Sequence, residues 1–225
     1  MDVSPILDGL NQEQRNAVTA APGPALVLAG AGSGKTRVLV HRIAWLCNVE
    51  GVSPYGLLAV TFTNKAAAEM RSRVESLLEA NLSGMWVGTF HGIAHRMLRA
   101  HWQEANLPQA FQILDSDDQH RLVKRIMKGL ELDESKWPVK QAQWFINARK
   151  DEGLRASQIQ DGGDLTTRQL LRVYTAYEAA CERAGVVDFA ELLLRSLELL
   201  RNNEDIMTHY RNRFRHVLVL SLIHI

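Results

Sequence analysis

The sequence lacks most features that mark a special class of protein. It has two cysteines in 225 residues, Cys47 and Cys181, and neither belongs to a CxxC pair, which argues against a disulfide framework or a zinc ribbon. No apolar run approaches the roughly 18 residues that a membrane span needs. The first residues show no basic stretch followed by an apolar core, as a secretory signal would. We therefore expect a cytoplasmic protein in a reducing compartment, with no membrane partner.

A strong net charge is also absent. The 26 Lys and Arg residues oppose 25 Asp and Glu residues, which leaves a formal net charge of +1. Neither residues 1–89 nor residues 90–225 are basic, and no charge run resembles a nucleic-acid-binding arm. Charge alone therefore does not predict nucleic-acid binding. The 46% hydrophobic content is enough for one or two compact domains with real cores.

The first 89 residues alternate between strand and helix patterns. Short apolar runs at 24–30, 57–62 and 85–90 are typical of buried strands in a parallel sheet. Helical spacing of apolar residues follows the first strand at 35–47 and the second strand after Asn64, which can cap the second helix. Strands that alternate with helices predict an α/β fold with a parallel sheet.

The pattern changes after the third strand, where residues 90–214 read as helices with no convincing strand. Ser116 is a plausible helix cap with Gln119 as its partner, Pro138 can open a helix, and Asp188 with Glu191 forms another cap pair. We therefore predict three parts, which are the first part of an α/β domain at 1–89, an inserted all-helical subdomain at 90–214 and a returning strand at 215–219.

The strongest motif is a glycine-rich loop between the first strand and its helix. Its backbone N–H groups and the positive end of the helix favour phosphate oxygens. Lys35 can reach the β- and γ-phosphates, and the Thr36 hydroxyl can complete a Mg²⁺ shell. Ala29 stands where the usual pattern has its first glycine. The loop predicts a P-loop NTPase fold and consists of Ala29, Gly30, Ala31, Gly32, Ser33, Gly34, Lys35 and Thr36.

The loop alone does not identify the class of enzyme, because kinases, GTPases and transport ATPases also carry such a loop. The surrounding motifs are more specific. Residues 10–18 resemble the adenine-recognition segment of superfamily 1 DNA helicases, with Gln14 at the glutamine. Residues 61–70 and 88–96 resemble the next two motifs of that superfamily, in the same order. The set is similar to the UvrD/Rep/PcrA group, and in particular to the bacterial UvrD group.

The resemblance implies a RecA-like motor domain that uses ATP and Mg²⁺, with Lys35 and Thr36 in catalysis and Arg37 near the base. It implies 3′-to-5′ unwinding in DNA repair, with single-stranded DNA, duplex junctions and repair proteins as partners. Aromatic faces can stack on bases, and polar side chains can bind phosphates. Trp144 is a candidate for contact with duplex DNA. The implied contacts to single-stranded DNA are Phe62, Thr63, Asn64, Thr89, Phe90 and His91.

The resemblance also indicates missing parts. In the family an acidic Mg²⁺-binding motif follows the strand at 215–219, whereas no Asp or Glu occurs here after Asp205. Residues 220–225 match the translation of a transposon end used in DNA library preparation, so we expect a non-native tail. We expect an amino-terminal fragment with an incomplete sheet, poor solubility and no ATP hydrolysis by itself.

Three other interpretations remain open from the sequence. The chain can be a natural short module that binds nucleotide or DNA without turnover. It can belong to a helicase–nuclease subunit, whose distinguishing parts would lie further along. It can also be another P-loop enzyme such as a small-molecule kinase, although the Gln14 segment and the two DNA-type motifs argue against that.

Overall fold

A computed structural model of the protein describes residues 3–80, 82 and 84–220, and it contains two compact units. The first unit extends to Ile93 and resumes at Thr208, and the second comprises Ala94–Met207. The second unit is therefore inserted between the two parts of the first. The limits at 89/90 and 214/215 that the sequence suggests remain predictions, because compactness alone does not define where a domain ends.

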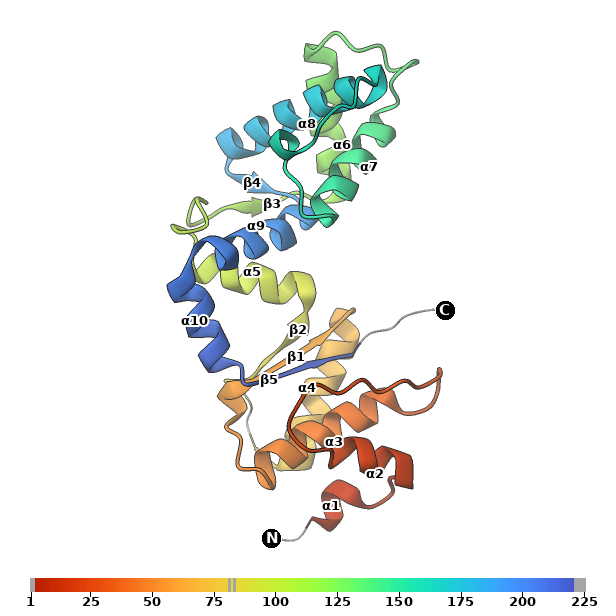
Figure 1. Cartoon of the computed structure of the whole chain (residues 1–225), viewed down its shortest axis with the longest axis vertical. Helices are drawn as coiled ribbons and strands as arrows, with labels where there is room; N and C mark the ends of the chain where they lie inside the picture. Colours follow the sequence, from red (N-terminus) through yellow and green to blue (C-terminus); the bar gives the residue numbers. More distant parts are fainter. Residues whose placement is uncertain (1–2, 81, 83, 221–225) are drawn as a thin grey trace. The chain divides into compact units, whose positions relative to one another are not determined.

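The first unit is built on a three-stranded parallel sheet in the order β2-β1-β5 (Figure 1). The strands are β1 (Leu57–Thr61), β2 (Trp86–Thr89) and β5 (His216–Val219). In register, Thr61 of β1 lies opposite Thr89 of β2, and Val60 lies opposite Val219 of β5. The sequence-based assignments of these three strands and of a parallel sheet are confirmed.

Helices cover one face of this sheet. α3 (Lys35–Asn48) and α4 (Asn64–Leu78) place Val40, Ile43, Met70 and Val74 in one buried cluster with Leu57 and Ala59 of β1. α1 (Ser4–Leu7) and α2 (Gln12–Val18) pack on α3 in a smaller cluster. The amphipathic spacing of α3 and α4 thus has its expected consequence, because the apolar stripe of each helix faces the sheet.

The other face of the sheet is only partly covered. Trp86 of β2 packs against Tyr210 and Phe214, with ring centroids 5.7 and 5.2 Å apart. Tyr210 belongs to α10 (Glu204–Arg213), which explains why the end of this helix joins the first unit. On β5, however, Val217 and Val219 are 58% and 49% exposed.

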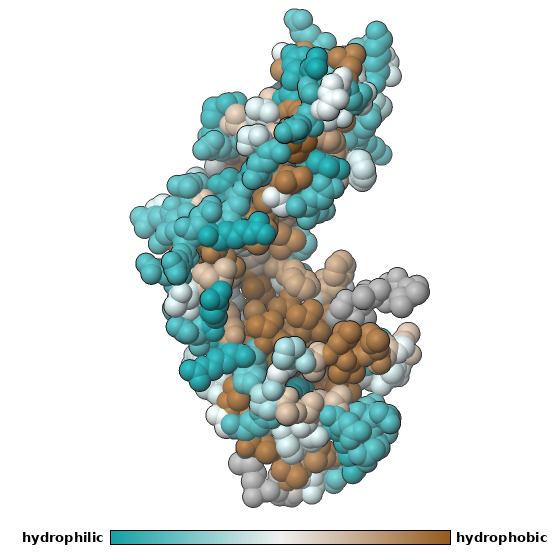
Figure 2. Space-filling view, in the orientation of Figure 1, coloured by the Kyte–Doolittle hydropathy of each residue, from teal (hydrophilic) through white to brown (hydrophobic). Residues whose placement is uncertain are grey.

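The predicted strand at 24–30 is wrong. No described residue from 22 to 30 belongs to a strand, and Leu26 and Leu28 are each 84% exposed. A strand is stabilised by its ladder of hydrogen bonds, and the run at 24–30 pairs with none of the described strands β2, β1 and β5. Its apolar side chains are therefore left at the surface, and Figure 2 shows hydrophobic residues gathered on the surface of the first unit. The poor solubility that we expect from such exposure stays a prediction.

Leu220 is the one described residue of the predicted non-native tail. Its N–H donates to the carbonyl of Val60 at 2.8 Å, and its side chain is 6% exposed in the cluster beneath the sheet. Residues 221–225 lie outside the described residues, so the origin of the tail stays a prediction.

The second unit is mainly helical. Its buried cluster joins Val123 and Met127 of α6 to Ile146 of α7 and to Tyr174 and Tyr177 of α8. Its helices are the later part of α5 (Phe90–Ala100), α6 (Ser116–Gly129), α7 (Val139–Asp151), α8 (Leu165–Ala184), α9 (Phe189–Asn202) and the start of α10. Short 3₁₀ turns occupy Ala156–Gln158 in this unit and Pro54–Gly56 in the first unit.

Three details of this unit differ from the sequence-based prediction. It is not purely helical, since β3 (Gln112–Ile113) pairs in parallel with β4 (Val186–Val187), and two-residue strands leave no periodic pattern. The cap of α6 is Asp115, whose carboxylate accepts from the Asp118 N–H, one residue before the predicted Ser116. Pro138 caps α7 instead of opening it.

The Asp188 cap is confirmed, since its carboxylate accepts from the Glu191 N–H at 2.7 Å. Among the described residues, no helix is long and apolar enough to cross a membrane.

Candidate nucleotide and DNA site

The loop before α3 leaves the start of that helix open to an anion. Gly34 is the N-cap, and no side chain caps the first N–H groups. The first turn carries no acidic residue that would neutralise the positive end of the helix. Unpaired N–H groups and the helix dipole therefore point at the same place, which suits phosphate oxygens.

Two of the three loop glycines are required by the backbone. Gly32 and Gly34 adopt left-handed φ angles of 76° and 83°, whereas Gly30 does not have a positive φ. A Cβ on Gly34 would also lie 2.9 Å from Nε2 of Gln14. The loop thus forms a cradle that is tight at position 34, where a side chain would displace that of Gln14.

The side chain of Lys35 lies back over this cradle. Its ammonium donates to the carbonyl oxygens of Ala29 and Gly30, both at 2.9 Å. Ser33 closes the same turn, since its hydroxyl donates to the Gly30 carbonyl at 2.6 Å. Phosphate oxygens are stronger acceptors than carbonyl groups for a charged amine. The residues present therefore fit a nucleotide phosphate, with Thr36 beside Lys35 in the first turn of α3.

Gln14, which the resemblance assigns to the base, lies against the glycine-rich loop, and its amide is already engaged. Its Oε1 accepts from the Asn11 N–H at 3.1 Å as part of the capping box of α2. Its Nε2 donates to the Ser33 carbonyl at 3.1 Å. An amide has two N–H groups and two oxygen lone pairs, so one of each remains for an adenine edge.

Arg37 is an exposed residue in the first turn of α3. One of its guanidinium nitrogens lies 2.8 Å from the place that a Cβ on Gly9 would occupy. Gly9 has a left-handed φ of 75° and lies between α1 and α2. Arg37 therefore reaches the turn that precedes α2, the helix that carries Gln14. The resemblance assigns Gln14 and Arg37 to the base, and both lie on the same side of the loop.

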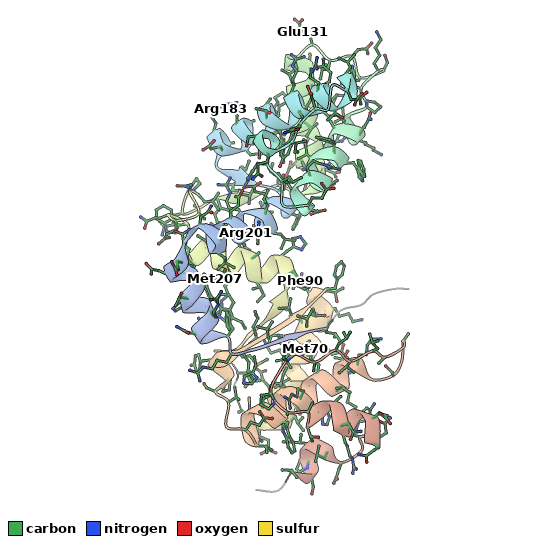
Figure 3. The ribbon with its side chains drawn as sticks, viewed as in Figure 1. Met70, Phe90, Glu131, Arg183, Arg201 and Met207 are labelled. Atoms are coloured by element: carbon green, nitrogen blue, oxygen red, sulfur yellow. The ribbon has the colours of Figure 1, made fainter. Side chains whose placement is uncertain are left out.

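The two DNA-type motifs meet at the carboxyl edge of the sheet. Because Thr61 and Thr89 lie opposite each other in parallel strands, the residues that follow them emerge side by side. Phe62 follows β1 and is 73% exposed, and Phe90 begins α5 and is 44% exposed. Figure 3 labels Phe90 where β2 meets α5. Two aromatic side chains thus extend from one edge.

Polar groups accompany these rings. The Thr63 hydroxyl caps α4 by accepting from the Ala66 N–H, and the Thr89 hydroxyl accepts from the Gly92 N–H, both at 3.1 Å. Each hydroxyl keeps its own O–H to donate. Asn64 is the first residue of α4 and not its cap, which corrects the sequence-based prediction. His91 lies half-buried in the first turn of α5.

The sequence comparisons agree with this architecture. A sequence profile described as the UvrD/REP helicase N-terminal domain matches residues 10–219. The chain belongs to the UvrD/REP helicase family. It is 62% identical over 219 residues to DNA helicase II of Escherichia coli, a match that covers 97% of this chain and 30% of that protein.

More distant UvrD/REP relatives also match 97% of this chain. The chain is 38% identical over 221 residues to the ATP-dependent DNA helicase PcrA of Leuconostoc citreum, which covers 97% of this chain and 30% of that protein. DNA helicase II of Haemophilus influenzae is 56% identical over 223 residues. The chain spans about 30% of the length of the curated relatives that it matches.

Sequence reasoning missed one polar residue of this UvrD/REP unit. Thr61 ends β1 and has a side chain that is 0% exposed, with no hydrogen-bond partner for its hydroxyl among the described residues. A buried strand gives no sign of this, because threonine is common in strands. The available signal was its place as the first residue of the motif at 61–70, directly before Phe62.

Proposed function

We propose that this chain carries the ATP-binding loop and part of the single-stranded-DNA surface of an ATP-dependent DNA helicase that moves 3′ to 5′ in DNA repair. The observation that carries the proposal is the open start of α3, where Lys35 folds over an uncapped helix end. The edge of the sheet that carries Phe62 and Phe90, called here the aromatic edge, lies in the same compact unit. ATP binding and DNA binding on one unit are what a translocating motor needs.

In this proposal each part of the loop has its own task. The N–H groups of residues 30–36 surround the phosphates, and Lys35 exchanges its carbonyl partners for β- and γ-phosphate oxygens. The Thr36 hydroxyl would help to hold a bound Mg²⁺ ion, which would offset phosphate charge. Gln14 and Arg37 hold the base and its surroundings.

The aromatic edge takes the second substrate. Phe62 and Phe90 stack on successive bases, and the O–H groups of Thr63 and Thr89 donate to phosphates. Asn64 and His91 lie in the first turns of α4 and α5 and add further phosphate contacts. Stacking is tolerant of base identity, as a protein that moves along any sequence requires.

Replacing Phe62 or Phe90 with alanine is expected to weaken binding of single-stranded DNA by about 1–3 kcal/mol each, roughly 5- to 150-fold, because one stacked base is lost. Fluorescence anisotropy with labelled oligothymidine measures this. Tyr55→Ala is the matched control, since Tyr55 is 61% exposed in the same unit but precedes β1 at the opposite edge. Equal losses for all three variants would contradict the assignment of the edge.

Strand displacement tests the function itself. The protein translated from the complete reading frame that contains these residues, called here the complete gene product, is expected to unwind a duplex with a 3′ single-stranded tail when ATP and Mg²⁺ are present. A duplex with only a 5′ tail should remain intact. Preferential unwinding of the 5′-tailed duplex would contradict the proposed 3′-to-5′ direction. If neither duplex is unwound, the proposed helicase activity is wrong.

A further inference from the structure

The helix α2, which carries Gln14, is tied to its surroundings near both ends. Near its start, Nε2 of Gln14 donates to the Ser33 carbonyl of the glycine-rich loop at 3.1 Å. At its last residue, the guanidinium of Arg42 on α3 donates to the Val18 carbonyl at 2.8 Å. Gln14 and Val18 are four residues apart and therefore share one face of the helix. The face that presents Gln14 to the loop is thus the face that α3 holds.

A helix as short as α2 depends on such contacts for its position. It has seven residues, and isolated helices of fewer than about 12 residues are marginal in water. Val18 is 0% exposed and packs with Leu10 and with Ala44 of α3. Apolar packing has no preferred direction, whereas a hydrogen bond has one. The bond from Arg42 therefore fixes where the end of α2 lies along α3.

Arg42 is itself held in place. Its side chain is 14% exposed, and the nitrogen that contacts Val18 also lies 3.3 Å from Oε1 of Glu50. The indole N–H of Trp45 donates to the same oxygen of Glu50 at 3.1 Å. A charged donor makes a stronger hydrogen bond than a neutral one, and a cation is favoured at the negative end of a helix. The end of α2 is thus tied to a fixed group.

The position of α2 decides where the remaining groups of the Gln14 amide point. Its Oε1 accepts from the Asn11 N–H and its Nε2 donates to Ser33, which leaves one lone pair and one N–H. Hydrogen bonds weaken steeply when their angle departs from linear. A small shift of α2 would therefore misdirect both groups. It would leave the first N–H groups of α3 in place, because these belong to another helix.

We propose that Arg42 is a positioning residue for recognition of the nucleotide base, which holds the end of α2 so that the Gln14 amide meets an adenine edge. The neighbouring residue His41 supports the same segment, since its Nδ1 lies 2.5 Å from the carbonyl oxygen of Ile6 in α1. The inference rests on the proposed nucleotide function and on Gln14 as a residue that binds the base. It predicts that Arg42 governs the preference for adenine and leaves phosphate binding unchanged.

The test measures Mg²⁺-dependent binding of ADP and GDP analogues, each labelled on the ribose, to the complete gene product and its variants. The unchanged protein is expected to bind ADP more tightly. Arg42→Met removes the donors and keeps a long side chain. It should weaken ADP binding about 5- to 10-fold, as misdirected hydrogen bonds do, and change GDP binding by less than about twofold. Arg42→Lys keeps a charged donor and should recover most of the ADP affinity.

Arg73→Met is the matched control for Arg42→Met. Arg73 lies on α4 in the same unit, and its ion pair with Glu69 is half exposed to water. The same substitution there should change neither affinity. If Arg42→Met does not fold, Arg42→Gln takes its place with the same expected result, because its shorter side chain stays polar.

A double-mutant cycle shows whether Arg42 acts through Gln14. Gln14→Ala should lower the preference for ADP by itself, and adding Arg42→Met should then change little, because the group that Arg42 positions is already gone. Arg42→Met would overturn the inference if it weakens ADP and GDP binding alike, or if its full effect adds to that of Gln14→Ala. Both patterns belong to a packing role. ADP binding by Arg42→Met within about twofold of the unchanged protein would overturn it too.

Two further variants separate this failure from a failure of the proposed function. If Gln14→Ala keeps the preference for ADP, or if the unchanged protein has none, the assignment of Gln14 to the base is wrong and the inference falls with it. If Lys35→Ala binds both analogues with unchanged affinity, the nucleotide site itself is misassigned. A preference that is lost in Gln14→Ala and kept in Arg42→Met contradicts the role of Arg42 alone.

Discussion

Replacing Lys150 with methionine is expected to destabilise the helical unit by about 3–5 kcal/mol, because it leaves the buried carboxylate of Asp188 without a cation. Lys150 lies on α7 with a side chain that is 2% exposed. Its ammonium donates to Asp188 at 2.7 Å and to Glu191 at 2.9 Å. Methionine keeps the length and much of the volume, so the change isolates the charge. Hydrogen exchange of the α7 and α9 amides in the complete gene product measures the loss.

The network around Lys150 explains the size of this effect. Asp188 also accepts from the Tyr177 hydroxyl at 2.7 Å, and Glu191 is paired with Arg155 and Arg195 at 2.8 and 2.7 Å. These groups come from three helices and two connecting segments, so one removal disturbs several contacts. The predicted cap of α9 is thus also part of a buried ion cluster.

Lys140→Met is the matched control for this prediction. Lys140 lies on the same helix but is exposed, so the same substitution should change the free energy of unfolding by less than about 0.5 kcal/mol. Equal effects at both positions would show that the cluster contributes nothing beyond helix propensity.

Acid should act on the same cluster through Glu191. Burial alone raises the pKa of Glu191, but Lys150 and Arg155 outweigh it and hold the pKa at about 2, below the ordinary value of 4.5. The stabilisation is therefore fully present above pH 4.5 and is lost as the pH falls toward 2. In Glu191→Gln this part of the acid destabilisation of α9 should be absent, as hydrogen exchange at several pH values would report.

The second large effect is expected from Lys35→Ala, which should lower DNA-stimulated ATP hydrolysis by the complete gene product about 10²- to 10³-fold. The ammonium of Lys35 lies over the loop cradle, where it contacts the carbonyl oxygens of Ala29 and Gly30. Its removal takes away a charge that should stabilise the transferred phosphate. A phosphate-release assay with excess single-stranded DNA measures the rate.

Lys128→Ala serves as the control for Lys35→Ala, because Lys128 is exposed on α6 in the other unit. It should leave the rate unchanged. Hydrolysis by Lys35→Ala within threefold of the unchanged protein would contradict the assignment of the loop.

Local sequence patterns predicted the elements whose signals are themselves local. β1, β2, β5, α3 and α4 follow from short apolar runs, helical spacing and cap residues. The run at 24–30 has the same apolar character, yet it forms no strand, because a strand also depends on a partner that may lie anywhere in the chain. Pairings of two residues, as in β3 and β4, fall below what any periodic pattern can show.

The positions of the site residues were predictable to a similar extent. Phe62 and Phe90 were expected at the carboxyl ends of two strands, and the structure places both at the same edge of the sheet. Their contact with DNA stays a prediction. The contact of Gln14 with the Ser33 carbonyl joins residues 19 positions apart and was not foreseen, since the resemblance implied only that Gln14 recognises the base. The ion cluster of Lys150 and the buried hydroxyl of Thr61 were not foreseen, since each depends on long-range packing.

The most direct test of the account is ATP hydrolysis with and without single-stranded DNA, measured on the complete gene product and on the 225-residue chain. We predict DNA-stimulated hydrolysis by the complete gene product and none by the 225-residue chain, which has no Asp or Glu after β5 to support Mg²⁺ and the attacking water. Hydrolysis by the 225-residue chain alone would show that another group replaces those carboxylates. Hydrolysis by neither would contradict the motor that we propose.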